Sequence, residues 1–281
     1  MEILDLLKKK RPLYAERINT AWVAATGCDF VNDNITAVNL VMFTDYFKDQ
    51  VSENSARTYL AYVKSCINTL KADGKLKQLP PAWERSAKVK AEQVAMCYLT
   101  EEEVERLVDY TPKNDYERKV RAQFLVECYT GARSSDVVRL TKENIDAQGN
   151  ITYISQKTKI RTIVPCKPLV REIIEDGDNK ENPRSAIPLK TKNEIIRRML
   201  KAVGVNDVVK VFKGGEELTG EKYTFCSTHT GRRTFCTNLY LRGVDLYTIS
   251  RLAGHSSVTI TEHYVVCGIR ALSKQAMEYF K

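Results

Sequence analysis

The first eighty residues carry apolar positions at helical spacing in two segments. The segment 36–50 begins at Thr36, a good N-cap residue, and the segment 55–73 ends before Gly74, where a left-handed residue often closes a helix. The apolar stripe of the first segment contains Val38, Phe43, Tyr46 and Phe47, and that of the second contains Leu60, Val63, Ile67 and Leu70. The pattern predicts two amphipathic helices.

The helical period stops near residue 78. Pro80 and Pro81 end helices, and the charged stretch that follows them has no clear period as far as residue 97. A new helix begins at Thr100, with Glu103 at the spacing of a capping box. These changes predict a helical domain at 1–85, a linker at 86–97 and a second domain at 98–281.

The second domain is expected to be mostly helical. Helical patterns cover 117–130 before Gly131, 192–205, 229–242 before Gly243, 246–253 between Asp245 and Gly254, and 268–281. Two short β-branched runs, 151–156 and 160–164, predict a hairpin with Lys157 and Lys159 near its tip. The predicted fold class is therefore mainly α with a small antiparallel β-sheet.

The composition of the chain indicates its net charge and the compartment in which it is expected. The 281 residues carry a net charge of +9, which fits a polyanionic partner, nucleic acid first and a membrane surface second, although a soluble basic protein has the same charge. The chain contains no apolar run of membrane-spanning length, and its first charges follow an apolar stretch, unlike a secretory signal. The eight cysteines are scattered without zinc-ligand spacing. We expect a cytoplasmic protein with reduced cysteines and no metal.

Several basic or polar side chains stand at the ends of the predicted elements. They are Arg133 after a helix end, Lys157 at the hairpin tip, His229 and Arg232 one helical turn apart, His255 after a helix end, and Tyr264 nine residues later. Each of these features is common by chance. Together they suit attack on a phosphodiester.

The chemistry of a tyrosine nucleophile explains this combination. A phenol with a pKa near ~10 is a poor nucleophile until a base or a positive field assists it. Arginines bind the charged phosphate oxygens bidentately, and a lysine can protonate the departing 5′ oxygen. Histidines can accept the phenol proton and hydrogen-bond the phosphate. Arginines that supply the positive charge remove the need for a metal.

The order and spacing of these motifs resemble those of tyrosine recombinases of the phage integrase family. The matching stretches are "TGAR", "QKTK", "HTGR", "AGH" and "EHY", and "SENSARTYLAYVKSCINTL" is similar to the family's helical core-binding domain. Among members of that family, the sequence is similar to integrases of Bacteroides-like phages and mobile elements. The resemblance implies a two-domain clamp around duplex DNA and strand transfer without ATP or metal.

The resemblance also implies roles for individual residues. Tyr264 would form a 3′-phosphotyrosine, Arg133 and Arg232 would stabilise the transition state, and His255 would assist them. Lys157 would be the general acid and His229 the proton acceptor, with Lys159 a rival for the lysine role. Asp136 would support the active site by holding a catalytic side chain. Its place in the first turn of a helix offers a purely structural reason for the same residue.

The resemblance further implies partners. They are double-stranded DNA, a homotetramer on paired sites and an accessory DNA-bending protein, in the bacterial nucleoid or a phage-infected cell. Candidate DNA contacts are Arg57, Thr58, Tyr62, Lys64 and Lys159, although the helix that carries the first four, taken by itself, favours a solvated face. Two other functions stay open at this point, a type IB topoisomerase and a catalytically silent DNA-binding protein. The helix expected at 268–281 could pack on its own chain or on a neighbour.

Overall fold

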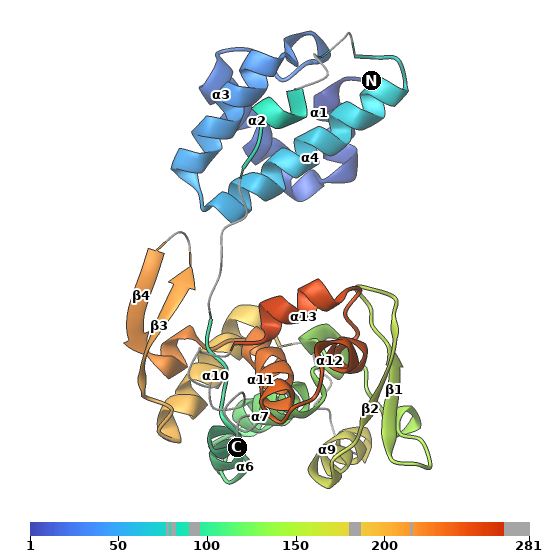
Figure 1. Ribbon diagram of the computed structural model, residues 1–281, viewed down its shortest axis with the longest axis vertical. Coiled ribbons are helices and arrows are strands. Elements are labelled where there is room, and N and C mark those ends of the chain that lie inside the picture. Colours follow the sequence, from blue (N-terminus) through green and yellow to red (C-terminus); the bar gives the residue numbers. More distant parts are fainter. Residues whose placement is uncertain (77–78, 80–82, 90–95, 180–186, 214–215, 267–281) are drawn as a thin grey trace, which may run out of the picture. The chain divides into compact units, whose positions relative to one another are not determined.

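The computed structural model describes residues 1–281 except 77–78, 80–82, 90–95, 180–186, 214–215 and 267–281. The chain divides into two compact units (Figure 1). The first comprises Met1–Val94 with Phe212–Glu217, and the second comprises Ala95–Val211 with Leu218–Lys281. The helix expected at 268–281 lies outside the described residues.

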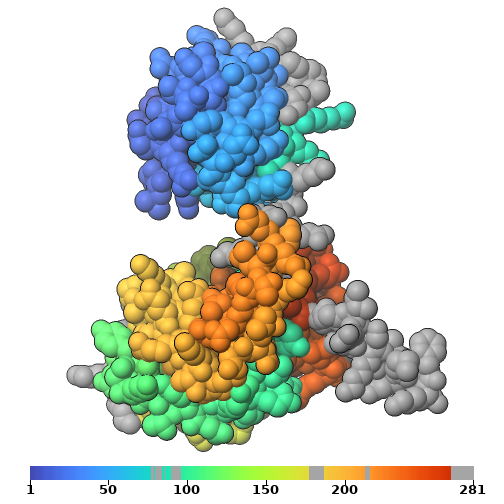
Figure 2. Space-filling view, turned by 90° about the vertical axis from the view of Figure 1, so that its left-hand side faces the viewer, coloured from blue at the N-terminus to red at the C-terminus, as the bar shows by residue number. Residues whose placement is uncertain are grey.

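The first unit is a bundle of helices around an aromatic core. Its elements are α1 (Ile3–Lys10), α2 (Pro12–Thr26), η1 (Asn32–Asn34), α3 (Ala37–Gln50), α4 (Glu53–Ala72) and α5 (Trp83–Ser86). The Trp22 ring lies 4.8 Å from that of Phe30 and 5.4 Å from that of Phe43, and all three side chains are buried. Helices α1 to α4 form the closely packed blue body of Figure 2.

The two helices expected in this unit are confirmed, with one error in the stripe. Thr36 caps α3 by accepting a hydrogen bond from the Asn39 amide, and Gly74 follows α4 with a φ of 69°. Val38 was assigned to the buried stripe, but 67% of it is exposed. The buried face is centred on Phe43, and a residue five positions earlier lies about 140° around the helix from it.

The stretch 78–97 is more than a connection. It contains the short helix α5, and Leu79, Ala87 and Val89 are buried in the core of the first unit. These three apolar residues are too widely spaced to give a period, which explains why the pattern alone shows only a charged stretch.

The chain after the linker is helical with two small sheets. Its helices are α6 (Glu101–Val108), α7 (Asp115–Thr130), α8 (Ser134–Val137), η2 (Lys142–Asn144), α9 (Pro168–Asn179), α10 (Leu189–Ala202), η3 (Lys222–Phe225), α11 (Thr228–Leu241), α12 (Leu246–Ala253) and α13 (Val258–Tyr264). Its strands are β1 (Asn150–Ile154), β2 (Arg161–Pro165), β3 (Val208–Lys213) and β4 (Glu216–Glu221). The predicted mainly α fold class and the antiparallel hairpin β1–β2 are confirmed.

Several elements were not predicted, among them α1, α2, α9, the pair β3–β4 and α13. The pair β3–β4 does have a signal, since "VVKVFK" is followed by Gly214 and Gly215, a common hairpin turn sequence. Helix α13 has a misleading one, because Val258, Thr259 and Ile260 are β-branched and disfavour helix. Tertiary packing therefore overrides the local strand preference at α13.

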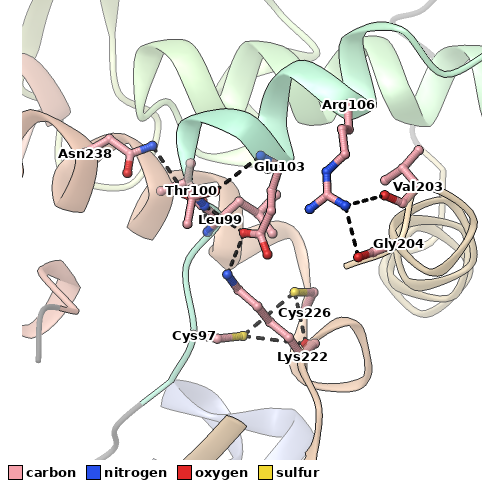
Figure 3. Close-up of polar contacts among 11 residues, drawn as sticks. Cys97, Leu99, Thr100, Glu103, Arg106, Val203, Gly204, Lys222, Cys226 and Asn238 are labelled. Atoms are coloured by element: carbon pink, nitrogen blue, oxygen red, sulfur yellow. Dashed lines mark hydrogen bonds and ion pairs between the residues drawn. The ribbon is translucent and has the colours of Figure 1, made fainter. Parts of the chain in front are cut away.

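The first turn of α6 is bound to α11 and to η3 (Figure 3). Thr100 and Glu103 form the expected capping box, and the buried ammonium of Lys222 pairs with the Glu103 carboxylate. The backbone of Leu99 donates to the Thr234 hydroxyl at 2.9 Å and accepts from the Asn238 amide at 3.2 Å. One face of α11 therefore holds the chain where it enters the second unit.

The cysteines of the described residues are free thiols, as expected from their spacing. Two of these thiols, Cys97 and Cys226, lie beside the Glu103–Lys222 ion pair, with their sulfur atoms 3.8 Å apart (Figure 3). Across the described part of the chain, every helix is too short or too polar to span a bilayer.

A buried ion pair connects α10 to α7. The Lys192 ammonium donates to the Glu127 carboxylate at 2.7 Å and also to the Ser134 hydroxyl, and both charged side chains are almost fully buried. Burial raises the pKa of Glu127, and the charge of Lys192 opposes that rise. Because Ser134 begins α8 directly after Arg133, this pair supports the corner on which Arg133 stands.

Replacing Lys192 with Met should destabilise the second unit by about 3–5 kcal/mol, because an unpaired carboxylate is left buried. Urea unfolding followed by circular dichroism measures this loss. Replacing Glu127 with Leu in the same chain removes the stranded charge and should restore much of the stability. A single variant as stable as the wild type would contradict the argument.

Candidate active site

The side chains singled out from the sequence lie at the ends of five neighbouring elements. Helices α11, α12 and α13 lie side by side, and β2 packs along α12 (Figure 1). The α7–α8 corner carries Arg133, the β1–β2 turn carries Lys157, and α11 carries His229 and Arg232. His255 follows α12, and Tyr264 is the last residue of α13.

Arg133 is held through a short hydrogen-bonded chain. Its Nη1 donates to the Ser155 hydroxyl at 2.9 Å, and that hydroxyl donates to the Asp136 carboxylate at 3.1 Å. Asp136 is buried and stands in the first turn of α8. Its carboxylate also accepts a hydrogen bond from the backbone N–H of Gln156 at 2.8 Å. The carboxylate thus orients Arg133 indirectly and fixes the hairpin turn that follows.

Arg232 is a buried cation with unused hydrogen-bonding capacity. Its Nε donates to Nε2 of His255 at 3.1 Å, and its Nη1 donates to the Gly131 carbonyl. Its Nη2 is buried without a hydrogen-bond partner among the described residues. Burial and the nearby charge of Arg133 lower the pKa of Arg232. An anion placed here would satisfy Nη2 and both positive charges.

His255 is neutral and its tautomer follows from its partners. Because an arginine can only donate, Nε2 must be the acceptor, and Nδ1 therefore carries the hydrogen that faces the Thr261 hydroxyl at 2.8 Å. Burial, with the positive charges of Arg232 and Arg133, lowers the pKa of His255 to about 3. In this arrangement the ring holds the Arg232 guanidinium in place.

Tyr264 packs directly against these two groups. Its ring stacks on His255 with centroids 4.9 Å apart, and the Cζ atom of Arg232 lies 5.3 Å from the same ring. The side chain is half-buried. The phenol is therefore beside the guanidinium that has an unsatisfied donor.

Two glycines allow these elements to approach. A Cβ atom on Gly254, whose φ is 64°, would lie 2.4 Å from the Thr162 hydroxyl of β2. A Cβ atom on Gly231 would lie 2.8 Å from Cβ of Glu127, where α11 crosses α7. Only glycine fits at either position, so the "HTGR" and "AGH" motifs include residues required by packing.

His229 and Lys157 lie at the exposed side of the group. The protein around His229 displaces water and, with the positive charges of Arg233 and Arg232, lowers the pKa of that histidine. Lys157 is exposed in the hairpin turn, and Lys159 beside it has a φ of 58°. The Thr158 hydroxyl donates to the Gly254 carbonyl at 3.3 Å, which attaches the turn to the His255 loop.

The candidate DNA contacts on α4 lie in the first unit. Arg57 and Thr58 are exposed. The Tyr62 ring lies under the Arg11 guanidinium at 4.9 Å, and the Lys64 ammonium donates to the Glu84 carbonyl at 3.0 Å. The exposed pair is therefore the more available for an external ligand.

Sequence reasoning missed the partners that hold the site. Ser155 links Arg133 to Asp136, Thr261 fixes the tautomer of His255, and the Gly131 carbonyl anchors Arg232. Serine and threonine are common surface residues, and their positions carry no motif. Only the folded arrangement identifies them.

Comparison with known proteins agrees with this geometry. A sequence model of the phage integrase family matches residues 97–267, which include every candidate active-site residue. The chain belongs to the phage integrase family. The resemblance inferred from the motifs is confirmed.

Other members of the family are similar over most of the chain. Tyrosine recombinase XerA of Pyrococcus furiosus is 29% identical over 218 residues, which cover 75% of this chain and 71% of that protein. Tyrosine recombinase XerC of Staphylococcus aureus is 29% identical over 193 residues, covering 66% of this chain and 61% of its own length.

Solved integrase structures share the fold. The integrase of transposon Tn1549, in complex with a circular intermediate DNA, has a TM-score of 0.67 at 15% identity, with 99% of both chains covered. A lambda integrase dimer bound to a core site has a TM-score of 0.63 at 18% identity, covering 94% of this chain and 95% of that one.

The pKa of His255 predicts a pH dependence of stability. An unfolded histidine titrates near ~6.5, so between that pH and about 3 the unfolded chain binds the proton and the folded one does not. The free energy of unfolding should therefore fall as the pH is lowered through this window, by at most about 1.4 kcal/mol per pH unit from this residue.

The comparison of wild type with His255→Asn isolates this contribution. The difference in unfolding free energy between the two chains, measured by urea titration from pH 8 to pH 4.5, should shrink toward low pH. A difference that does not change with pH would show that His255 does not titrate as described.

Proposed function

We propose that the chain is a site-specific DNA recombinase that cuts and rejoins strands through a phosphotyrosine. The single observation that carries the proposal is the buried Arg232 guanidinium, whose Nη2 has no hydrogen-bond partner in the described part of the chain and whose Cζ lies 5.3 Å from the Tyr264 ring centroid. A phosphate bound at that Nη2 would be adjacent to the phenol. The relatives are named tyrosine recombinases XerA and XerC. Their names support strand exchange between two DNA sites over the relaxation of supercoiled DNA by a topoisomerase.

The cleavage step conserves the ester. The Tyr264 oxygen attacks the scissile phosphorus and forms a new P–O bond, while the bond to the 5′ oxygen breaks. The products are a 3′-phosphotyrosine and a 5′-hydroxyl. Since one phosphodiester replaces another, the step needs no ATP. A 5′-hydroxyl from the partner duplex reverses the attack and completes the exchange.

Arg133 and Arg232 stabilise the charge that develops on the non-bridging oxygens. Their guanidinium groups are fixed before substrate arrives, through Ser155 and His255 respectively. Donors that are already oriented spend no reorganisation energy during the reaction. Burial, and after it the charge of Arg133, lowers the pKa of Arg232 in the free chain, and a bound phosphate relieves the repulsion between the two arginines.

His229 and Lys157 move the protons. The lowered pKa of His229 keeps its imidazole neutral near pH 7, so it can accept the phenol proton. Lys157, on the exposed turn, reaches the 5′ oxygen and donates a proton to it. His255 contributes by holding Arg232 and by stacking on Tyr264.

The partners of the reaction are duplex DNA and further copies of the chain. The net charge of +9 provides attraction to the phosphate backbone. Arg57 and Thr58, with Tyr62, Lys64 and Lys159, are the proposed contacts outside the site. Two paired sites contain four strands to exchange, which calls for a homotetramer. The proposed location is the bacterial nucleoid or a phage-infected cell, and the proposed accessory partner is a DNA-bending protein.

Covalent trapping tests the nucleophile. Wild-type chain mixed with nicked duplexes from the ends of its own element should give DNA that migrates with protein in denaturing gels. Tyr264→Phe should give none, because it lacks the attacking oxygen. Adducts in both lanes would assign the nucleophile to another residue.

A plasmid with two copies of the trapped site distinguishes the possible activities. Recombinant products support the proposal, and four chains per synaptic complex by analytical ultracentrifugation support the tetramer. Relaxed plasmid without recombinants would indicate a topoisomerase. Tight binding without adducts would indicate a DNA-binding protein.

A sulfur substitution identifies the general acid. Lys157→Ala should slow cleavage of ordinary DNA by about 10²–10⁴-fold but leave DNA with a 5′-bridging sulfur nearly unaffected, because a thiolate departs without a proton. Lys159→Ala is the matched control: loss of a proposed DNA contact can weaken binding, but at saturating DNA its cleavage rate should be close to wild type on both substrates. The reverse pattern would move the role to Lys159.

A further inference from the structure

Thr237 occupies an unusual position on α11. It is fully buried, and its hydroxyl accepts a hydrogen bond from the Val266 amide at 2.9 Å and donates to the Tyr264 carbonyl at 3.3 Å. The two backbone groups lie on either side of Val265, directly after the tyrosine. One hydroxyl therefore fastens the chain at the point where α13 ends.

This bonding differs from that of several other helical threonines in the chain. A threonine inside a helix commonly donates to the carbonyl four residues earlier. That local bond is made by Thr44, Thr69 and Thr130, at 2.6, 3.0 and 2.6 Å. Thr237 instead directs its hydroxyl to another element, α13, which lies beside α11 (Figure 1).

The end of α13 needs such a partner. The last carbonyls of a helix have no acceptor role within it, and this helix ends at an extended Val265 rather than at a glycine cap. With seven residues, several of them β-branched, α13 has little stability of its own. An external contact must therefore decide where its last residue lies.

We infer that Thr237 is a positioning residue that sets the location of the Tyr264 phenol relative to the phosphate-binding arginine. Arg232 and Thr237 stand on the same helix, so the guanidinium and the anchor of the tyrosine backbone share one rigid element. The inference rests on the proposed function, in which Tyr264 attacks a phosphate bound by Arg232. A displacement of about 1 Å at the nucleophile can cost about 100-fold in rate.

The test uses Thr237→Val, which keeps the shape and removes the hydroxyl, and Thr237→Ser, which keeps the hydroxyl. Hydrogen exchange of the Val266 amide, followed by NMR on the intact chain, reports the contact without any need for activity. Exchange should be about tenfold faster in the valine variant, as expected for a lost hydrogen bond, and near wild type in the serine variant.

Single-turnover cleavage of a nicked duplex then reports the positioning role. The valine variant should lose about 100-fold in cleavage rate at saturating DNA, while its Kd for DNA stays unchanged. Thr237→Ser should restore the rate. Thr234→Val is the matched control, because Thr234 lies one turn away, is equally buried and holds Leu99 instead.

Each outcome decides a separate point. Unchanged Val266 exchange in the valine variant would overturn the contact. Faster exchange with normal cleavage, or equal loss in Thr234→Val, would overturn the positioning role. A wild-type chain that forms no adduct would instead overturn the proposed function, and the exchange result would still establish whether the contact exists.

Discussion

An uncompensated positive charge organises the second unit. Arg232 is buried, and among the described residues it has a carbonyl and a neutral imidazole as hydrogen-bond partners rather than a carboxylate. A buried cation without an anion costs free energy, which the surrounding packing must supply. The cost is acceptable where a phosphate completes the site. The neutrality of His255 and the lowered pKa of His229 both follow in part from the same positive field.

Helix α11 is the common reference for the groups around this charge. It carries Arg232, holds the α13 backbone through Thr237 and holds the start of the unit through Thr234 and Asn238. Its close crossing with α7 depends on Gly231. Because one helix makes all these contacts, its rigidity sets the position of Tyr264 relative to Arg232, whereas Arg133 and Lys157 are held by the α7–α8 corner and the hairpin turn.

Local chemistry made most of the fold predictable. Caps such as Thr36, Thr100 and Asp245 act within one turn, so sequence spacing reveals them. Helix α13 was not predictable in this way, since its β-branched residues favour strands and tertiary contacts override them. The candidate residues follow from motif order, but the hydroxyls that orient them, such as that of Ser155, lie far away in sequence and have no local signature. The catalytic roles of the candidate residues stay predictions.

The order of the site along the chain has a consequence for its assembly during synthesis. Arg133 leaves the ribosome first, Arg232 and His255 follow, and Tyr264 comes after all of them. Thr261, the Nδ1 partner of His255, is also translated after that histidine. A growing chain therefore contains both arginines before it contains the phenol. The nucleophile is thus synthesised after every group that would bind the phosphate it attacks.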